Sequence, residues 1–160
     1  MRSGDRLETV LGARIEITMS DGGRMVIGED ASVFFKALET PDEGKWKILI
    51  ELAKGPLRFA TGMVSKLLHH DVSIKTETGV LGRRGTDFNT YVKTDPGRFG
   101  GITDSSPRGT YVYVREGVVY MKSDVGQIDV EEKQVAYSGD RSAVPKLLLP
   151  VPEFIHKDDL

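Results

Sequence analysis

The side chains that could bind a metal ion are few and poorly spaced. His69 and His70 are adjacent and precede Asp71, whereas His156 stands alone near the end of the chain. Adjacent residues of an extended chain point to opposite sides, so the two imidazoles cannot reach one ion without a bend. The chain has no cysteine. A structural zinc site uses four spaced histidine or cysteine ligands, so we predict no metal site.

Nucleophilic and acid–base chemistry have as little support. No serine lies in a G-x-S-x-G turn. Residues 82–86, GRRGT, lack the spacing and the following helix of a phosphate-binding loop. Adjacent carboxylates fall in polar turns or in the tail, where no dry site would separate their pKa values; they are Glu29-Asp30, Glu131-Glu132 and Asp158-Asp159. We therefore predict that the protein is not an enzyme and uses no cofactor.

Composition excludes further classes of protein. The 22 basic and 24 acidic residues give a net charge of −2, without the dominant positive charge of a nucleic-acid-binding surface. No apolar run approaches the roughly 18 residues of a membrane-spanning helix. The N-terminus, MRSGDRLETV, lacks the apolar core of a signal peptide. A length of 160 residues suits one domain.

Residues 72–92 form the centre around which the chain is organised. Two alternating runs, each predicting a half-buried strand, flank the GRRGT segment. Glycine permits positive φ and close backbone approach, so this segment predicts a bulge or a sharp corner. We expect Arg84 to bond to Asp87 or to turn carbonyls, and Arg83 to contact a partner. The predicted structural corner consists of Gly82, Arg84, Gly85, Thr86 and Asp87.

Similar alternation elsewhere predicts further strands, for example over Ala13–Met19 and Trp46–Leu52. Turns recur about every ten residues, which is typical of a sandwich, barrel or roll. We expect Ala53–Pro56 to reverse the chain into a new strand over Leu57–Ala60. Residues 64–69 are the one stretch that could form a helix. The pattern alone leaves a two-sheet sandwich and a curled roll as alternatives.

Two segments depart from the strand pattern. Thr94–Gly109 is rich in glycine, proline and serine, and loops of this length are usually functional or disordered. Its candidate partner-binding residues, chosen for contact energy, are Arg98, Phe99, Ile102 and Arg108; the alternative is a mobile tip with Phe99 packed locally. Residues 138–160 contain three closely spaced prolines, which favour an extended path along the surface. We therefore predict a β domain over 1–137 and an extension over 138–160.

Residues 76–88, TETGVLGRRGTDF, resemble the central motif of the FecR domain, T-P-T-A-V-x-G-V-R-G-T-x-F. Three further segments resemble that family in the correct order: GDRLET at 4–9, the strand and Asp-Gly turn at 13–22, and VYVREGVV at 112–119. The resemblance runs from about Gly4 to Val130. It departs from the family pattern at Glu77, at Arg83 and in the insertion after Val92.

The resemblance implies an all-β domain of antiparallel hairpins curled into a roll or short solenoid, with a two-sheet sandwich as the alternative. It also implies a periplasmic or otherwise extracytoplasmic location, because known members lie outside the cytoplasmic membrane. The best understood members relay signals from outer-membrane transducers to sigma factors. Because the first motif begins at Gly4, we expect targeting signals to have been removed upstream.

The function implied by the resemblance is non-catalytic binding of another protein of the cell envelope. The contact would be a strand edge or the 94–109 loop. One alternative is a glycan- or cell-wall-binding module, which needs a platform of solvent-facing aromatics. The candidates for such a platform are Tyr111, Tyr113 and Tyr120. Another alternative is a scaffold subunit of an envelope assembly.

Overall fold

The computed structural model describes residues 1–39, 47–62, 71–83 and 86–160. The possible helix at 64–69 lies outside these ranges. Within them the regular secondary structure is β-structure apart from one short helix. The elements are β1 (Arg6–Glu8), β2 (Ile15–Thr18), β3 (Arg24–Ile27), β4 (Ser32–Glu39), β5 (Lys47–Ala60), β6 (Asp71–Lys75), β7 (Val80–Arg83), β8 (Asp87–Lys93), β9 (Arg98–Phe99), β10 (Ile102–Thr103), β11 (Gly109–Glu116), β12 (Val118–Lys122), β13 (Gln127–Glu131), β14 (Val135–Ser138), β15 (Lys146–Leu147) and α2 (Glu153–Lys157).

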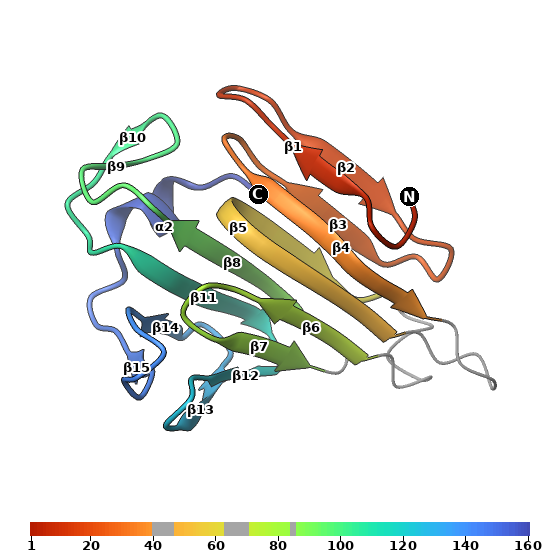
Figure 1. Ribbon diagram of the computed structural model, residues 1–160. Coiled ribbons are helices and arrows are strands. Elements are labelled where there is room, and N and C mark those ends of the chain that lie inside the picture. The colour runs from red at the N-terminus through yellow and green to blue at the C-terminus, as the bar shows by residue number, and fades with distance from the viewer. Residues whose placement is uncertain (40–46, 63–70, 84–85) are drawn as a thin grey trace.

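The long strand β5 lies at the centre of the fold (Figure 1). Its first half pairs with β4 and β6, and its second half pairs with β3 and β8. The predicted reversal at Ala53–Pro56 is wrong, because β5 continues through all four residues. Gly55 has a φ of 87°, and a Cβ there would collide with Ala31. These residues therefore bend the strand instead of ending it, and β3 and β4 follow the same bend on one side of β5.

Thirteen of the described strands form one curled sheet that folds over itself and nearly closes, and β9 and β10 form a separate two-stranded sheet. One layer has the order β13-β12-β7-β6-β5-β4-β1, and the other has the order β2-β3-β5-β8-β11-β14-β15. Among the described strands, β5 and β6 form the parallel pair, and the other pairs are antiparallel. The prediction of an all-β curled roll is confirmed.

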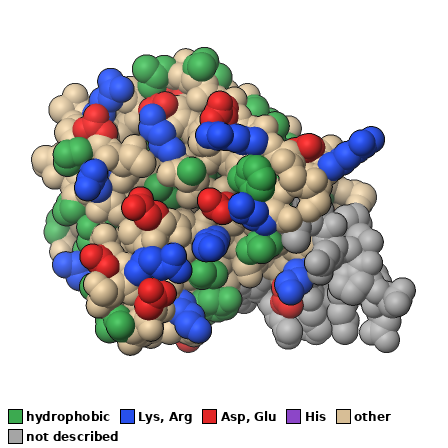
Figure 2. Space-filling view, in the orientation of Figure 1, with side chains coloured by type: hydrophobic (Ala, Val, Ile, Leu, Met, Phe, Trp, Pro, Cys, Tyr) green, Lys and Arg blue, Asp and Glu red, His purple; other side chains and the backbone are tan. Residues whose placement is uncertain are grey.

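The inner faces of the two layers form the main core. Alternate residues of each strand point inward, as a period of two requires. Val33, Phe35, Ile50 and Leu52 come from one layer, and Leu57, Phe88 and Val112 come from the other. On the face shown in Figure 2, acidic and basic side chains are interspersed and are not segregated by sign. An exposed ion pair, Lys36–Glu51, joins the neighbouring strands β4 and β5 at 3.3 Å.

Strand β8 departs from the predicted half-buried pattern, because both of its faces are buried. Phe88 and Val92 face the main core, whereas Asn89, Tyr91 and Lys93 are also almost inaccessible to solvent. The C-terminal residues and the 94–109 loop cover this second face. A second apolar cluster lies there, made of Tyr91, Phe99, Tyr111, Val135, Phe154 and Ile155.

The C-terminal segment packs closely against the rest of the chain. β15 pairs with β14, and α2 begins directly after Pro152. The prediction of an extended path is wrong over Glu153–Lys157, because proline is tolerated at the start of a helix, where no intrahelical N–H bond is lost. Phe154 on α2 is fully buried.

Candidate functional site

A buried lysine organises the 94–109 loop. The Lys93 side chain is 0% exposed, and its Nζ lies 3.0 Å from Oδ1 of Asp104, whose side chain is 6% exposed. Nζ also donates to the backbone carbonyl oxygens of Asp104, Ser106 and Pro96, at 2.8, 2.6 and 3.3 Å. Four oxygens from three positions of the loop therefore converge on one ammonium group.

The electrostatics of this cluster keep Asp104 ionised. Burial alone would raise the pKa of Asp104, but hydrogen bonds from Ser106 and Lys93 outweigh it and lower the pKa below its usual value. The backbone N–H of Ser106 donates to Asp104 Oδ1 at 2.8 Å. An ionised carboxylate and an ammonium group thus form a paired, hydrogen-bonded unit inside the domain, as buried charges require.

The loop contains a small hairpin that is anchored by an aromatic residue. β9 and β10 pair through Phe99 and Ile102. The Phe99 ring lies 4.9 Å from the ring of Phe154 and 5.7 Å from the ring of Tyr91, measured between centroids. Phe99 is 8% exposed, so it holds the hairpin against the domain.

The four loop residues predicted to bind a partner therefore differ in exposure. Phe99 is buried, and Ile102 is half-buried beside it. Arg98 and Arg108 are exposed; Arg98 pairs loosely with Asp95 at 3.6 Å, and the Arg108 carbonyl accepts a bond from Tyr137. The two arginines are available for contact, whereas the two apolar residues hold the loop in place.

A cleft of about 350 Å³ separates this hairpin from α2 and the N-terminal loop. Phe99, Phe154 and Pro56 contribute apolar lining, and Arg14 and Asp159 contribute charge. Glu29 holds the two walls of the cleft together. The two carboxylate oxygens of Glu29 accept hydrogen bonds from the backbone N–H groups of Gly12 and Gly101, at 2.7 and 3.0 Å. Three segments far apart in sequence thus form one preformed surface, which we call the loop cleft.

A polar network fixes the C-terminal residues at one side of the loop cleft. The Tyr91 hydroxyl donates to Asp158 Oδ2 at 2.6 Å, and Asn89 donates to the same oxygen at 3.2 Å. Burial raises the pKa of Asp158, although these bonds act against the shift. Burial and the neighbouring carboxylate raise the pKa of Tyr91 far above its usual range, so its hydroxyl remains a donor. Arg115 donates to Asn89 and to the Leu160 carbonyl oxygen, at 3.0 and 2.8 Å.

The predicted structural corner is described only in part. Arg84 and Gly85, and the side chain of Arg83, lie outside the described residues. Both carboxylate oxygens of Asp87 accept bonds from Arg58 on β5, at 2.9 and 2.6 Å. Thr86 is buried, and its backbone is bonded to Thr61. The predicted partnership of Arg84 with Asp87 stays a prediction; the partner of Asp87 that the structure describes is Arg58.

Gly82 allows a close approach between strands β7 and β12. A Cβ at Gly82 would occupy the same space as the Tyr120 ring, which lies over the glycine from the paired strand.

Nearby, hydroxyl groups tie the central motif to β11. Thr78 donates to Thr110 at 2.7 Å, and Thr110 donates to Thr76 at 2.8 Å. These motif residues thus have structural roles in joining the layers.

The aromatic residues considered for glycan binding do not form a common exposed platform. Tyr111 is 1% exposed within the second apolar cluster and donates to the Pro107 carbonyl oxygen at 2.7 Å. Tyr113 is half-buried against that cluster, and Tyr120 covers Gly82 on the other layer.

Within the described ranges, no group of three or more histidine, cysteine or acidic residues is arranged to hold a metal ion. In the same ranges, no helix has the length and apolar character needed to cross a membrane.

Comparison with known proteins identifies the family. The family model described as FecR protein matches residues 5–120, so the chain belongs to the FecR protein family. A search of curated proteins gave no significant match. Two crystal structures of a candidate anti-sigma factor from Parabacteroides distasonis share the fold, with TM-scores of 0.65 and 0.63 and identities of 13% and 12%. Each match covers 90% of this chain but only 59% of that protein, which is therefore longer.

Sequence reasoning missed the residues that hold the site together. Lys93 ends an alternating strand, Glu29 lies in a turn, and Phe154 lies among prolines. The partners of Lys93 are mainly backbone carbonyls, which have no signature in the sequence. The sequence did contain one usable signal. Phe99 and Phe154 are large apolar residues in segments otherwise rich in turn residues, which indicates that both segments pack against the domain.

Proposed function

We propose that this chain is a non-catalytic, extracytoplasmic domain that binds another protein of the cell envelope in signal transduction of the sigma-regulator type. Membership of the FecR family and a fold shared with a candidate anti-sigma factor support this class of function. Because that protein is longer than this chain, the anti-sigma role itself is part of the proposal.

The observation that carries the proposed contact is the fixed shape of the 94–109 loop. Lys93 and Phe99 anchor the loop from inside, and Glu29 ties it to the N-terminal loop. A preformed loop loses little conformational entropy on binding, so its exposed side chains contribute more of their contact energy to affinity. Arg98 and Arg108 are exposed on this loop, and arginine is enriched among the residues that dominate binding energy.

The test is capture from an envelope extract with the immobilised domain as bait, read by quantitative mass spectrometry. One variant carries Arg98→Ala and Arg108→Ala, which leave Lys93 and Phe99 in place. The control carries Lys133→Ala and Arg141→Ala, two exposed basic residues outside the loop. We expect an envelope protein that the native domain and the control capture equally, and the loop variant about tenfold less, as loss of about 1.4 kcal/mol predicts.

Two results would contradict the proposal. Equal capture by the loop variant and the control would remove the loop from the contact. Capture of cell-wall glycan without an envelope protein would replace the protein-binding function by a glycan-binding one.

A further inference from the structure

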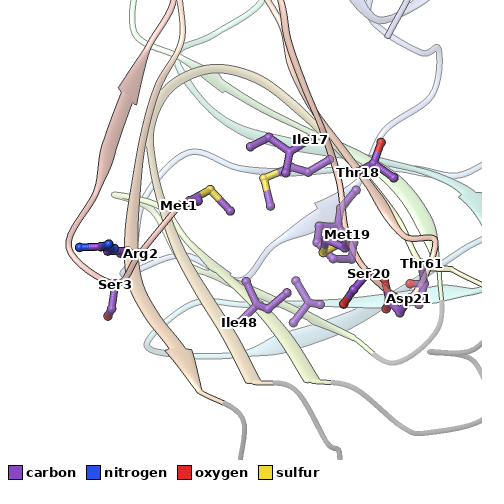
Figure 3. Close-up of a pocket in the computed structure, with 13 residues that line it drawn as sticks. Met1, Arg2, Ser3, Ile17, Thr18, Met19, Ser20, Asp21, Ile48 and Thr61 are labelled. Atoms are coloured by element: carbon purple, nitrogen blue, oxygen red, sulfur yellow. The ribbon is translucent and has the colours of Figure 1, made fainter.

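Two hollows of the domain differ in how closely they define an occupant. The open end of the roll has a cavity of about 600 Å³, and Figure 3 shows Ile17, Met19 and Ile48 around it. Its lining is mainly apolar, with hydroxyl groups and the Asp21 carboxylate beside it, so it fits many apolar molecules and selects none. The second face of β8 is different. A segment of the chain already lies on it and shows what that surface binds (Figure 1).

This segment, residues 153–160, is held by three buried apolar side chains. The ring of Phe154 lies within the second apolar cluster, with three other aromatic rings at centroid distances of 5.5, 4.9 and 5.1 Å. Ile155 is buried in the same cluster. The buried side chain of Leu160 lies over Gly28, where an added Cβ would come within 3.1 Å of it. The surface beneath the segment therefore has separate places for an aromatic and two aliphatic side chains.

The segment also offers hydrogen-bond acceptors to donors of that surface. Asp158 Oδ2 accepts from the Tyr91 hydroxyl at 2.6 Å and from Asn89 at 3.2 Å. The carbonyl oxygen of Leu160 accepts from Arg115 at 2.8 Å. Asn89 and Tyr91 are almost inaccessible to solvent. A segment that covered these donors without offering acceptors would leave them unpaired, and sites of this kind strongly reject such ligands.

An exposed stretch joins the segment to the roll. Leu149 is 93% exposed and Pro150 is also exposed. The last strand pair, β14 with β15, precedes this stretch, so residues 153–160 can leave the surface without breaking a strand pair. α2 has five residues, and a helix this short is not stable in water without packing partners. The segment is therefore ordered by the surface it covers.

The surface and the segment that covers it also differ in their relation to the family. The aromatic rings and hydrogen-bond donors that receive the segment all lie within residues 5–120, which the FecR model matches, and the segment lies outside them. The receiving surface is thus part of the matched domain, and its occupant is an addition.

We propose that the second face of β8 is a groove for short segments of the pattern Phe-Ile-x-x-Asp-x-Leu, with asparagine as an alternative to aspartate. Residues 153–160 are a latch that fills this latch groove until such a segment of a partner protein displaces them. The helical turn presents the first two anchors to the groove, as in other helix-in-groove complexes. This inference is independent of the contact proposed for Arg98 and Arg108, because those side chains are exposed and the latch groove is covered.

The first experiment uses the full chain with the recognition sequence of a specific protease inserted between Leu149 and Pro150. The folded chain is cut there, and a fluorescent peptide of residues 151–160 is titrated into cut and uncut samples, with anisotropy as the readout. In the uncut chain the tethered latch competes at a high effective concentration. We therefore expect the peptide to bind the cut chain at least about tenfold more tightly than the uncut chain.

Peptide variants test which contacts define the occupant. Phe154→Ala and Asp158→Ala should each weaken binding at least about tenfold, because each removes a buried anchor. The matched control is His156→Ala, at an exposed position of α2, which should stay within about twofold. A peptide that keeps phenylalanine, isoleucine and leucine, has asparagine for Asp158 and differs elsewhere should bind as well as the native sequence. It represents the segment of a foreign partner.

A variant of the groove tests the polar contact itself. Tyr91→Phe keeps the ring but removes the donor to Asp158. The Asp158→Ala peptide should therefore lose less affinity against this variant than against the native groove, because both changes remove the same bond. Equal losses would show that the Tyr91 hydroxyl does not recognise the segment.

Hydrogen exchange on the unmodified chain measures whether the latch opens by itself. The N–H of Ile155 bonds to the Pro152 carbonyl oxygen at 3.1 Å. The amides of β8 lie in a strand that is paired on both sides. Segments that open locally exchange faster than the core. We expect the protection factor of the Ile155 amide to be at least about tenfold lower than that of the most protected β8 amides.

Four outcomes would overturn the proposal. A cut chain that binds no peptide, or that unfolds on cutting, would make residues 153–160 a permanent part of the core. Equal binding of the Phe154→Ala peptide and the control would remove the pattern. Equal protection of α2 and β8 would show that the latch opens only when the whole domain unfolds. Dimers of the uncut chain in sedimentation would assign the groove to the latch of a second copy.

These assays contain only this chain and its peptides. Their failure would leave the envelope-capture result with Arg98 and Arg108 unaffected, so the two proposals can fail separately.

Discussion

Replacing Lys93 by methionine tests whether the buried ammonium group holds the 94–109 loop in place. Methionine has a similar length but cannot donate to the four oxygens around Nζ. Asp104, with a side chain 6% exposed, would then be a buried charge without its cation. Breaking a buried pair in this way costs about 3–5 kcal/mol. The N–H of Ser106 still bonds to Asp104 in the variant, which favours the lower half of that range.

The assay is urea unfolding at neutral pH, followed by circular dichroism. The matched control is Lys54→Met, which breaks the Lys54–Asp30 pair of 2.8 Å; its side chains are 42% and 26% exposed. An exposed pair of this kind contributes at most about 1 kcal/mol. We therefore expect Lys93→Met to lower the free energy of unfolding several times more than Lys54→Met does. Equal losses in the two variants would refute the role assigned to Lys93.

The pH dependence of the same variant provides a second check. The folded-state pKa of Asp104 is lowered, so its ionised form stabilises the native protein above the unfolded-state pKa of about 4. That contribution is lost as the pH falls through the folded-state pKa. The difference in stability between the native chain and Lys93→Met should therefore shrink below about pH 4. A difference that stays constant down to about pH 3 would contradict the pairing.

Three further predictions concern the surroundings of the site. Phe154→Ala should lower the free energy of unfolding by about 3–5 kcal/mol in urea; a loss below about 1 kcal/mol would show that α2 does not hold the loop. Gly82→Ala should lower the free energy of unfolding by about 1–3 kcal/mol, because the added Cβ collides with Tyr120. Adding Tyr120→Ala to the same variant should recover most of that loss in thermal unfolding; no recovery would contradict the close approach. Burial raises the pKa of Asp158, so the stability linked to this group is present at low pH and lost as the pH rises through the folded-state pKa. Asp158→Asn should keep or raise stability at pH 7, because the amide oxygen still accepts from Tyr91; a loss above about 2 kcal/mol would refute this sign.

The strands and the curled roll could be predicted because they depend on local alternation. Ile15 and Ile17 face inward, as the pattern indicates, and the turn at Asp21-Gly22 joins β2 to β3. The glycine at position 82 permits the close approach that its residue type suggested, but Gly82 lies within β7, and the predicted corner stays a prediction. These features involve neighbouring residues or side-chain periodicity, which a single sequence contains.

The bend of β5 and the assembly of the candidate site could not be predicted in the same way. Gly55-Pro56 is a common turn signal, and only the shared partners on both sides of it keep the strand continuous. Lys93 occupies a position where alternation predicts exposure, but Asp104 and the loop carbonyls lie 3 to 13 residues away along the chain. Such burial depends on how the loop folds back, which residue types alone do not specify.

The arrangement around β5 also has a consequence for the rate at which the domain folds. One 14-residue strand must find partners in β3 and β4 before it in the chain and in β6 and β8 after it. Neither layer can be completed until β5 is in place, and its pairing with β8 closes a loop of 26 residues between Ala60 and Asp87. Closing such loops costs entropy before the contacts compensate for it, and domains dominated by non-local strand pairs fold in milliseconds to seconds. During that interval the edges later covered by β5 are exposed, so dilute conditions should favour refolding over aggregation.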